Sequence, residues 1–241
     1  MPTKEQLIIA LDFAQSEDAI ALVDAIGSAA SYYKVGLELF LNSKGSVIEA
    51  LKERDKKIFL DLKFHDIPNT VAQACRWAAG LGVDMFNVHA GGGYEMMQRA
   101  REATAEGALS KGLDVPQLIA VTILTSFDAD GIARVGFSGS VEENVKRLAA
   151  LTDEAGLNGV VCSSKEVPLI REAVVRPDFL TVCPGVRPEW AQKGDQKRIL
   201  TPAQAMAQGV NHIVVGRPIT QAADPMEATK KILAEMSVLE D

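Results

Sequence analysis

The feature that most constrains the fold is an alternation of short apolar runs with segments of helical pattern, repeated eight times along 241 residues. Each run has the length of a buried strand rather than that of a helix. Strands that alternate with helices indicate a parallel sheet, and eight such units favour a closed barrel over an open sheet. The predicted strands are Leu7–Leu11, Tyr32–Gly36, Lys57–Leu60, Asp84–Val88, Gln117–Leu124, Gly159–Cys162, Phe179–Cys183 and His212–Val215.

We therefore expect an α/β protein with the TIM (β/α)8 barrel fold, formed by residues 1–241 as a single domain. No linker or low-complexity tract interrupts the alternation. The expected helices include one that has Ser16 as its N-cap and ends near Ile26, one over residues 44–54 and one from Val71 to Ala79. Long polar loops are expected after the fifth and seventh strands, at residues 125–139 and 184–200.

Three charged residues follow the third predicted strand within six positions: Asp61, Lys63 and Asp66. Because side chains on a strand alternate between its two faces, Asp61 and Lys63 point the same way. Asp66 falls in the turn that follows, and Pro68 suits the first turn of a helix. Such a motif is typical either of a surface ion-pair cluster or of a functional site, and the local pattern does not separate the two.

The expected fold gathers further residues around this motif. In a TIM barrel the active site lies at the C-terminal ends of the strands, so residues at those ends share one face of the molecule. In addition to Asp61 and Lys63, this rule collects Asp12, Lys34, Thr125, Ser126, Arg187, Gln196, Gly216 and Arg217.

The loops after the seventh and eighth strands are the usual phosphate site of this fold. Here they contain Pro-Gly-Val-Arg-Pro at residues 184–188 and Val-Gly-Arg-Pro at residues 215–218. Glycines let backbone N–H groups approach an anion, and the Arg217 guanidinium can donate two hydrogen bonds to phosphate oxygens. The alternative is that these residues only shape turns, but two such loops at the expected positions favour a phosphate site.

Lys63 is the candidate proton donor, because the neighbouring carboxylates of Asp61 and Asp66 favour its ammonium form. A protonated lysine can stabilise a carbanion and then protonate it. The three histidines are scattered without metal-ligand spacing, so no metal site is predicted. His89 follows the fourth strand and either faces the pocket or, as we favour, is a hydrogen-bonded structural residue.

The totals argue against several classes of protein. A net charge of −7 disfavours a general binder of nucleic acids or of membrane surfaces. Cys75, Cys162 and Cys183 lie far apart in apolar surroundings, which predicts core residues rather than a disulfide framework or a zinc site. The first residues show no signal-peptide pattern and no apolar run is long enough to cross a membrane, so we expect a cytoplasmic protein.

The sequence Asp-Leu-Lys-Phe-His-Asp-Ile-Pro-Asn-Thr at residues 61–70 resembles the signature of the orotidine 5′-phosphate decarboxylase family. The ten-residue motif is specific, and the resemblance runs nearly end to end because shorter family motifs follow in the family's order. These are ALD at 10–12, KVG at 34–36, NVHA at 87–90, VTILTS at 121–126, PGVRP at 184–188, GDQ at 194–196 and VGRPIT at 215–220.

The resemblance implies a homodimeric barrel that converts the small molecule orotidine 5′-phosphate to UMP and carbon dioxide in pyrimidine nucleotide synthesis, without metal or organic cofactor. It implies that Lys34, Asp61, Lys63 and Asp66 form a network of alternating charge, in which Lys63 protonates C6 after carbon dioxide leaves. The resemblance also implies that Asp12 and Lys34 bind the ribose and that Thr125 and Ser126 contact the ribose–pyrimidine region. It implies that Asp66, Ile67 and Thr70 enter the neighbouring subunit's site. The phosphate region is expected to be bound by Arg187, Gln196, Gly216 and Arg217, with Gln196 on a closing loop.

Two alternatives stay open at this point. A sugar-phosphate decarboxylase of the same suprafamily shares the Asp-x-Lys-x-x-Asp core but uses magnesium, and Lys34 together with the continuation at residues 64–70 disfavours it. The second alternative is a barrel that binds nucleotides without catalysing a reaction. The intact Asp61, Lys63 and Asp66 argue against it.

Overall fold

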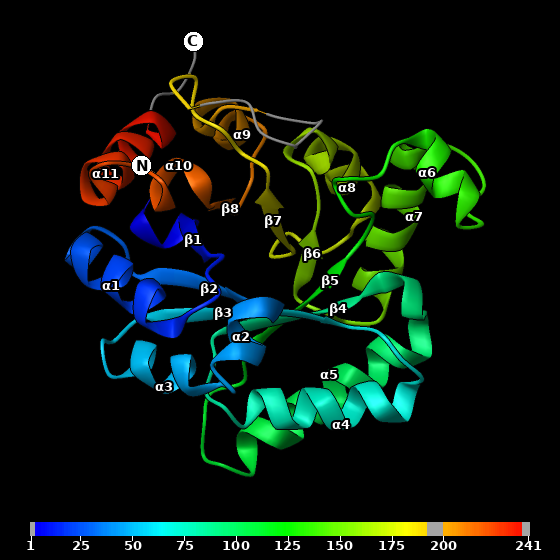
Figure 1. Cartoon of the computed structure of the whole chain (residues 1–241). Coiled ribbons are helices and arrows are strands. Elements are labelled where there is room, and N and C mark those ends of the chain that lie inside the picture. The colour runs from blue at the N-terminus through cyan, green and yellow to red at the C-terminus, as the bar shows by residue number, and fades with distance from the viewer. Residues whose placement is uncertain (1–2, 192–199, 238–241) are drawn as a thin grey trace.

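The computed structural model of the protein describes residues 3–191 and 200–237. Eight parallel strands close into a barrel in chain order, with β1 paired to both β2 and β8. Helices surround this barrel (Figure 1), so the predicted TIM barrel is confirmed. The strands are β1 (Leu7–Leu11), β2 (Tyr32–Gly36), β3 (Lys57–Phe64), β4 (Met85–His89), β5 (Gln117–Val121), β6 (Gly159–Val161), β7 (Leu180–Pro184) and β8 (His212–Val215).

The helices of the described residues alternate with these strands. They are α1 (Ser16–Ile26), α2 (Leu37–Asn42), α3 (Ser46–Lys52), α4 (Pro68–Ala79), α5 (Tyr94–Leu109), α6 (Ala129–Arg134), α7 (Val141–Glu154), α8 (Val167–Ala173), α9 (Pro202–Ala207), α10 (Arg217–Thr220) and α11 (Pro225–Met236). Single 3₁₀ turns occur at Lys4–Gln6, Gly27–Ala29, Ala90–Gly92 and Ser164–Glu166.

Several predicted helix boundaries are wrong. The helix expected over residues 44–54 begins only at residue 46, because Lys44 and Gly45 have φ of 51° and 84°, outside the helical region. Ser16 is the first residue of α1 rather than its N-cap, a position that Gln15 takes. No helix was predicted for the segments that form α2, α6 and α10.

Several strand ends also differ from the prediction: β4 covers residues 85–89 rather than 84–88, β6 ends at residue 161 rather than 162, and β7 covers residues 180–184 rather than 179–183. β5 ends at Val121 rather than at Leu124, since its partner β6 contributes only three residues and the pairing stops at Val161. β3 continues past the apolar run at residues 57–60 to Phe64, so that Asp61 and Lys63 lie at its C-terminal end, as expected.

Side chains of the strands divide between two apolar layers. In β1, Ile8 and Ala10 point into the barrel, whereas Leu7, Ile9 and Leu11 pack against the surrounding helices. The inner layer consists of Ile8, Ala10, Tyr32, Phe59, Met85, Ile119, Val182 and Val214. Because side chains alternate along a strand, the residue two positions after each inward-facing one also points toward the barrel axis. After Ala10, Tyr32, Phe59 and Met85, these residues are Asp12, Lys34, Asp61 and Asn87, respectively.

Cys75, Cys162 and Cys183 are buried and carry free thiols, as predicted for core residues. Within residues 3–191 and 200–237, none of the helices combines the length and the apolar character needed to cross a bilayer. The cytoplasmic location stays a prediction.

Candidate active site

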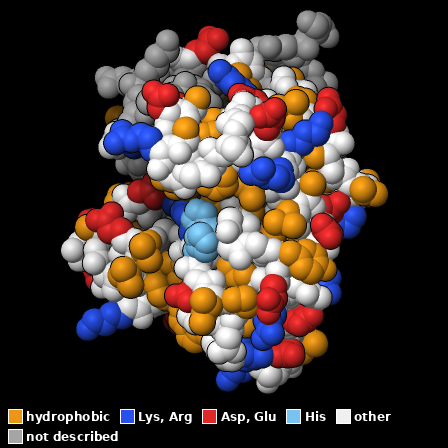
Figure 2. All heavy atoms as spheres, turned by 90° about the vertical axis from the view of Figure 1, so that its right-hand side faces the viewer, with side chains coloured by type: hydrophobic (Ala, Val, Ile, Leu, Met, Phe, Trp, Pro, Cys, Tyr) orange, Lys and Arg blue, Asp and Glu red, His pale blue; other side chains and the backbone are white. Residues whose placement is uncertain are grey.

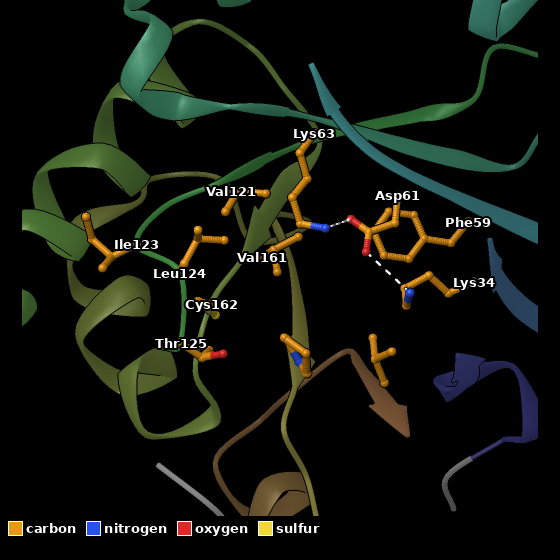
Figure 3. Close-up of a pocket in the computed structure, with 12 residues that line it drawn as sticks. Lys34, Phe59, Asp61, Lys63, Val121, Ile123, Leu124, Thr125, Val161 and Cys162 are labelled. Carbon is orange, nitrogen blue, oxygen red and sulfur yellow. Dashed lines mark hydrogen bonds and ion pairs between the residues drawn. The ribbon is translucent and has the colours of Figure 1, made fainter. Parts of the chain in front are cut away.

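A cavity of about 160 Å³ opens at the C-terminal end of the barrel. Figure 3 shows Lys34, Asp61 and Lys63 on one side of it and an apolar wall on the other. The lining side chains are Lys34, Phe59, Asp61, Lys63, Val121, Ile123, Leu124, Thr125, Val161, Cys162, Pro184 and Val214. The site therefore places three charges against a surface that offers few polar partners.

The charged side chains form a connected network of alternating sign. Asp61 bridges two lysines, since its Oδ1 lies 2.7 Å from Nζ of Lys63 and its Oδ2 lies 3.5 Å from Nζ of Lys34. Lys34 also donates a hydrogen bond of 3.0 Å to Oδ1 of Asp12. The side chains of Lys34 and Asp61 are only 11% and 12% exposed, so the centre of the network is shielded from solvent.

The ionisation of this network follows from its geometry. Burial alone would lower the pKa of Lys34, but the carboxylates of Asp61 and Asp12 outweigh it and raise that pKa above its usual value. Burial would likewise raise the pKa of Asp61, yet the Lys34 and Lys63 ammonium groups lower it below its usual value. Lys34 and Asp61 are thus both charged near neutral pH, where reduced solvation strengthens their interaction.

The backbone at Lys63 departs from regular strand geometry. Its φ of 53° lies in the left-handed region, which costs a non-glycine residue on the order of 1 kcal/mol. The pairing of β3 with β4 shifts at this point, because Leu60 faces Phe86 but Phe64 faces Val88. The predicted common direction of Asp61 and Lys63 is confirmed, although an irregular strand end produces it rather than simple alternation.

The other predicted residues of the pyrimidine side lie near the cavity to different degrees. Thr125 lines the cavity from the loop after β5, whereas the neighbouring Ser126 is exposed on the same loop. Asp12 is not among the described residues that line the cavity and connects to it through its hydrogen bond with Lys34. That loop, for which no helix was predicted, contains α6.

Asp66, Ile67 and Thr70 lie outside the cavity of their own chain. All three are exposed on the turn between β3 and α4 and on the first turn of α4, which begins at Pro68, three residues before the predicted start, with Pro68 in its first turn as expected. Oδ1 of Asp66 accepts the Ile67 backbone N–H at 2.7 Å. Among the described residues no ion pair joins Asp66 to Lys34, Asp61 or Lys63, so the expected link of Asp66 to the network is not formed within one chain, and its entry into a neighbouring subunit's site stays a prediction.

The predicted anion-binding residues come from the loops after β7 and β8, at the same end of the barrel. Arg187 is 9% exposed, and its backbone N–H donates to the carbonyl of Leu200 at 3.0 Å. Gly216 lies beside β1, since a Cβ built there would be 3.5 Å from Oδ2 of Asp12. Arg217 is exposed and begins α10, while Gln196 lies outside the described residues.

His89 takes part in a different contact from the one predicted. Its ring lies against that of His65, with centroids 5.2 Å apart and the planes tilted by 30°. Burial, then the proximity of His65 and Lys63, lowers the pKa of His89 to about 4, so the ring is neutral at neutral pH.

Sequence reasoning missed one residue of the network, Asn87. It is fully buried in β4 and contacts both Asp61 and Lys63. The available signal was a polar side chain in the middle of an apolar strand, two positions after the inward-facing Met85. Phe59 lines the cavity and was also not predicted as a site residue. Its residue type did not distinguish it, because any inward position of a barrel strand is expected to be apolar.

Comparison with known proteins identifies the family. A model of the Orotidine 5′-phosphate decarboxylase / HUMPS family matches residues 5–232. The chain belongs to this family. The resemblance noted in the sequence is therefore confirmed.

Individual members of the family match along nearly the whole chain. The orotidine 5′-phosphate decarboxylase of Nostoc sp. is 49% identical over 238 residues, which cover 98% of this chain and 99% of that protein. The enzyme of that name from Nitrosococcus oceani is 50% identical, with coverage of 97% and 98%. The crystal structure of orotidine 5′-phosphate decarboxylase from Lactobacillus acidophilus is 38% identical and has a TM-score of 0.85, with coverage of 97% and 100%.

Proposed function

We propose that this chain decarboxylates orotidine 5′-phosphate to UMP and carbon dioxide, a step of pyrimidine nucleotide synthesis, with neither metal nor organic cofactor. The observation that carries the proposal is the order Lys34–Asp61–Lys63 within one cavity. Full-length relatives at about half identity bear the name of this activity, which supports the choice of substrate.

Lys63 acts as the proton donor in this proposal. The bond between C6 and the carboxylate breaks, carbon dioxide leaves, and the electron pair stays on C6. The Lys63 ammonium stabilises this carbanion and transfers a proton to it, which forms UMP and leaves a neutral amine that solvent reprotonates. The 2.7 Å contact with Asp61 supports an ammonium held in a fixed position before the reaction.

Repulsion between Asp61 and the substrate carboxylate contributes less than this stabilisation. Two unit charges about 4 Å apart interact by roughly 4 kcal/mol at an effective dielectric near 20. Enzymes typically lower barriers by about 8–23 kcal/mol. Ground-state repulsion therefore falls short, and most of the effect must come from groups that favour the carbanion.

The phosphate group anchors the substrate in this proposal through Arg217, Gly216, Arg187 and Gln196. Arg217 is an exposed residue that directly follows Gly216, and a Cβ built at Gly216 would lie 3.5 Å from Oδ2 of Asp12. Asp12, Lys34, Thr125 and Ser126 contact the ribose and pyrimidine between the two ends. Phosphate contacts far from C6 contribute to catalysis when they drive loop closure, which excludes water.

We also propose a homodimer in which Asp66, Ile67 and Thr70 enter the neighbouring site. Ile67 is 66% exposed, and Leu37, Leu41 and Trp77 on nearby helices are also exposed apolar side chains. The rings of Phe40 and Trp77 lie 5.7 Å apart and bring α2 and α4 together. On the face in Figure 2, hydrophobic side chains lie across the middle and the lower part, interspersed with charged ones. Exposed apolar clusters of this kind mark contact surfaces.

Mixing two inactive variants tests the shared site. In a dimer of one Lys63→Ala chain and one Asp66→Ala chain, one site carries both changes and the other carries neither. Random reassembly should therefore restore about a quarter of the parental activity. Recovery no greater than the sum of the two variants would remove the proposed role of Asp66.

The activity itself is tested by following the ultraviolet absorbance of orotidine 5′-phosphate mixed with purified protein in excess EDTA. The proposal predicts rapid loss of the orotate signal. Turnover that requires added magnesium, or turnover of a sugar-phosphate acid instead, would favour the metal-dependent alternative. Tight binding of UMP without turnover would favour a nucleotide-binding barrel that lacks activity.

A further inference from the structure

We propose that Asn87 is a positioning residue for this reaction: it holds the Asp61 carboxylate and the Lys63 backbone in their working arrangement. This inference rests on the proposed decarboxylation. Asn87 is fully buried, and the described residues that line the cavity do not include it. Its effect on the substrate therefore passes through its two neighbours.

The amide of Asn87 bonds to both neighbours at once. Its Nδ2 donates to Oδ1 of Asp61 at 2.7 Å, and its Oδ1 accepts the backbone N–H of Lys63 at 2.8 Å. The same Oδ1 of Asp61 accepts Nζ of Lys63 at 2.7 Å. These three bonds close a ring that fixes the carboxylate, the lysine backbone and the lysine ammonium relative to one another.

The chemistry of the two partners fixes the orientation of the amide. A carboxylate only accepts hydrogen bonds and a backbone N–H only donates them. A flipped amide would face each partner with the wrong group. A side chain with one donor and one acceptor in this geometry is thus required. An ionised aspartate of similar size supplies only the acceptor, and a leucine supplies neither.

The irregular end of β3 explains why a side chain is needed there. Between the pairs Leu60–Phe86 and Phe64–Val88, β3 advances by four residues while β4 advances by two. Asn87 lies opposite the two additional residues of β3. Its side chain accepts a hydrogen bond from the Lys63 backbone N–H, which falls where the regular pairing of β3 with β4 is interrupted. The bond supports the left-handed conformation of Lys63, which turns its side chain back toward Asp61.

Replacement by leucine tests the proposal, with Asn158→Leu as a matched control. Asn158 directly precedes β6, and its Oδ1 accepts one backbone N–H from a neighbouring strand, that of Leu118, at 2.9 Å at the opposite end of the barrel. Asn87→Leu should lower kcat by roughly 10- to 100-fold, since small displacements of catalytic groups have effects of this size. The dissociation constant of UMP should change by less than about threefold, because the substrate contacts remain. Asn158→Leu should leave kcat within about twofold of the parent.

Asn87→Asp provides a second variant and a pH readout. The new carboxylate can still accept the Lys63 N–H but repels Asp61. Protonation would restore a donor toward Asp61, so the ratio of variant to parental kcat should rise as the pH falls. The comparison with the parent at each pH corrects for the other titratable groups that face this point, namely Lys34, Asp61, Lys63, His65 and His89.

Hydrogen exchange at the Lys63 amide reports on the same contact without any activity. The parent should protect this amide, and Asn87→Leu should lose most of that protection while distant core amides keep theirs. A folded Asn87→Leu protein with kcat within twofold of the parent would overturn the proposal. So would a kcat ratio for Asn87→Asp that does not depend on pH. A parent that exchanges as expected but does not turn over orotidine 5′-phosphate would instead contradict the proposed function alone.

Discussion

The two ends of the barrel use the same kinds of polar residue in different ways. At the N-terminal end, three polar side chains bond to the start of a neighbouring strand: Asp84, Asn158 and Asn211 accept the backbone N–H groups of Ile58, Leu118 and Thr181 at 2.8–2.9 Å. At the C-terminal end, Lys34, Asp61 and Lys63 bond to one another instead, and Asn87 joins them. The first arrangement closes the barrel and the second concentrates charge.

This difference separates stability from chemistry within one fold. A bond from a side chain to a backbone N–H satisfies a buried donor and contributes about 1 kcal/mol. A network of buried charges must offset a large desolvation penalty and gives little net stability. Its left-handed Lys63 adds strain, so the C-terminal end is organised for function at some expense of stability.

Replacing the two aspartates should give the largest contrast between the ends. Asp61→Asn leaves the Lys34 and Lys63 ammonium groups without their shared carboxylate, so kcat should fall by roughly 10²- to 10³-fold and stability by about 3 kcal/mol. Asp84→Asn keeps an oxygen that can accept the Ile58 N–H, and kcat should be unchanged. Turnover assays and urea unfolding of both variants check this prediction. Equal losses of kcat in the two variants would contradict the difference in role between the two ends of the barrel.

A smaller effect is expected at the proposed phosphate loops. Arg217→Ala should lower kcat/KM for orotidine 5′-phosphate by roughly 10- to 100-fold, because charge-assisted contacts that hold the phosphate in the closed complex are lost. Both KM and kcat should change, since binding energy there also drives closure. Steady-state kinetics decide the point, and parental values in the variant would remove the phosphate assignment.

The smallest effect concerns the two part-buried histidines, one near each end. Burial is the main cause of the lowered pKa of both rings. The pKa of His89 falls from 6.5 to about 4, and that of His212 falls by less. The unfolded chain then binds more protons below pH 6.5, so stability falls as the pH drops from 6.5 toward 4. His89→Gln should flatten this loss more than His212→Gln does, as measured by urea unfolding at several pH values. Identical slopes in parent and variants would contradict the sign of these shifts.

The sequence predicted the barrel well because short continuous apolar runs and their count are properties of the chain itself. It also predicted Asp61 and Lys63 on one side of a strand end. It missed α2 because Leu37 and Leu41 point outward and leave no apolar stripe toward the core. It overran β5 because the apolar run continues past Val121, whereas the length of the partner strand decides where pairing ends.

The contacts at Asn87 lay beyond sequence reasoning for a related reason. They depend on a shift of register between β3 and β4 and on a positive φ at a lysine, which no pattern of residue types indicates. The resemblance marked residues 87–90 as a motif without giving Asn87 a role. A polar residue at an inward strand position is the general signal that a structure can then interpret.

The central claim is that chemistry belongs to the C-terminal end of the barrel, and the two lysines at opposite ends of β3 test it most directly. Lys57 begins the strand and pairs with Glu5 at 3.0 Å, while Lys63 pairs with Asp61 at 2.7 Å near the strand's end. Single-turnover decarboxylation of orotidine 5′-phosphate should be measured in excess chelator for Lys57→Ala and Lys63→Ala beside the parent. We predict a loss of at least about 10³-fold for Lys63→Ala and a change within about twofold for Lys57→Ala. A Lys63→Ala protein that retains a tenth or more of the parental rate would contradict the account.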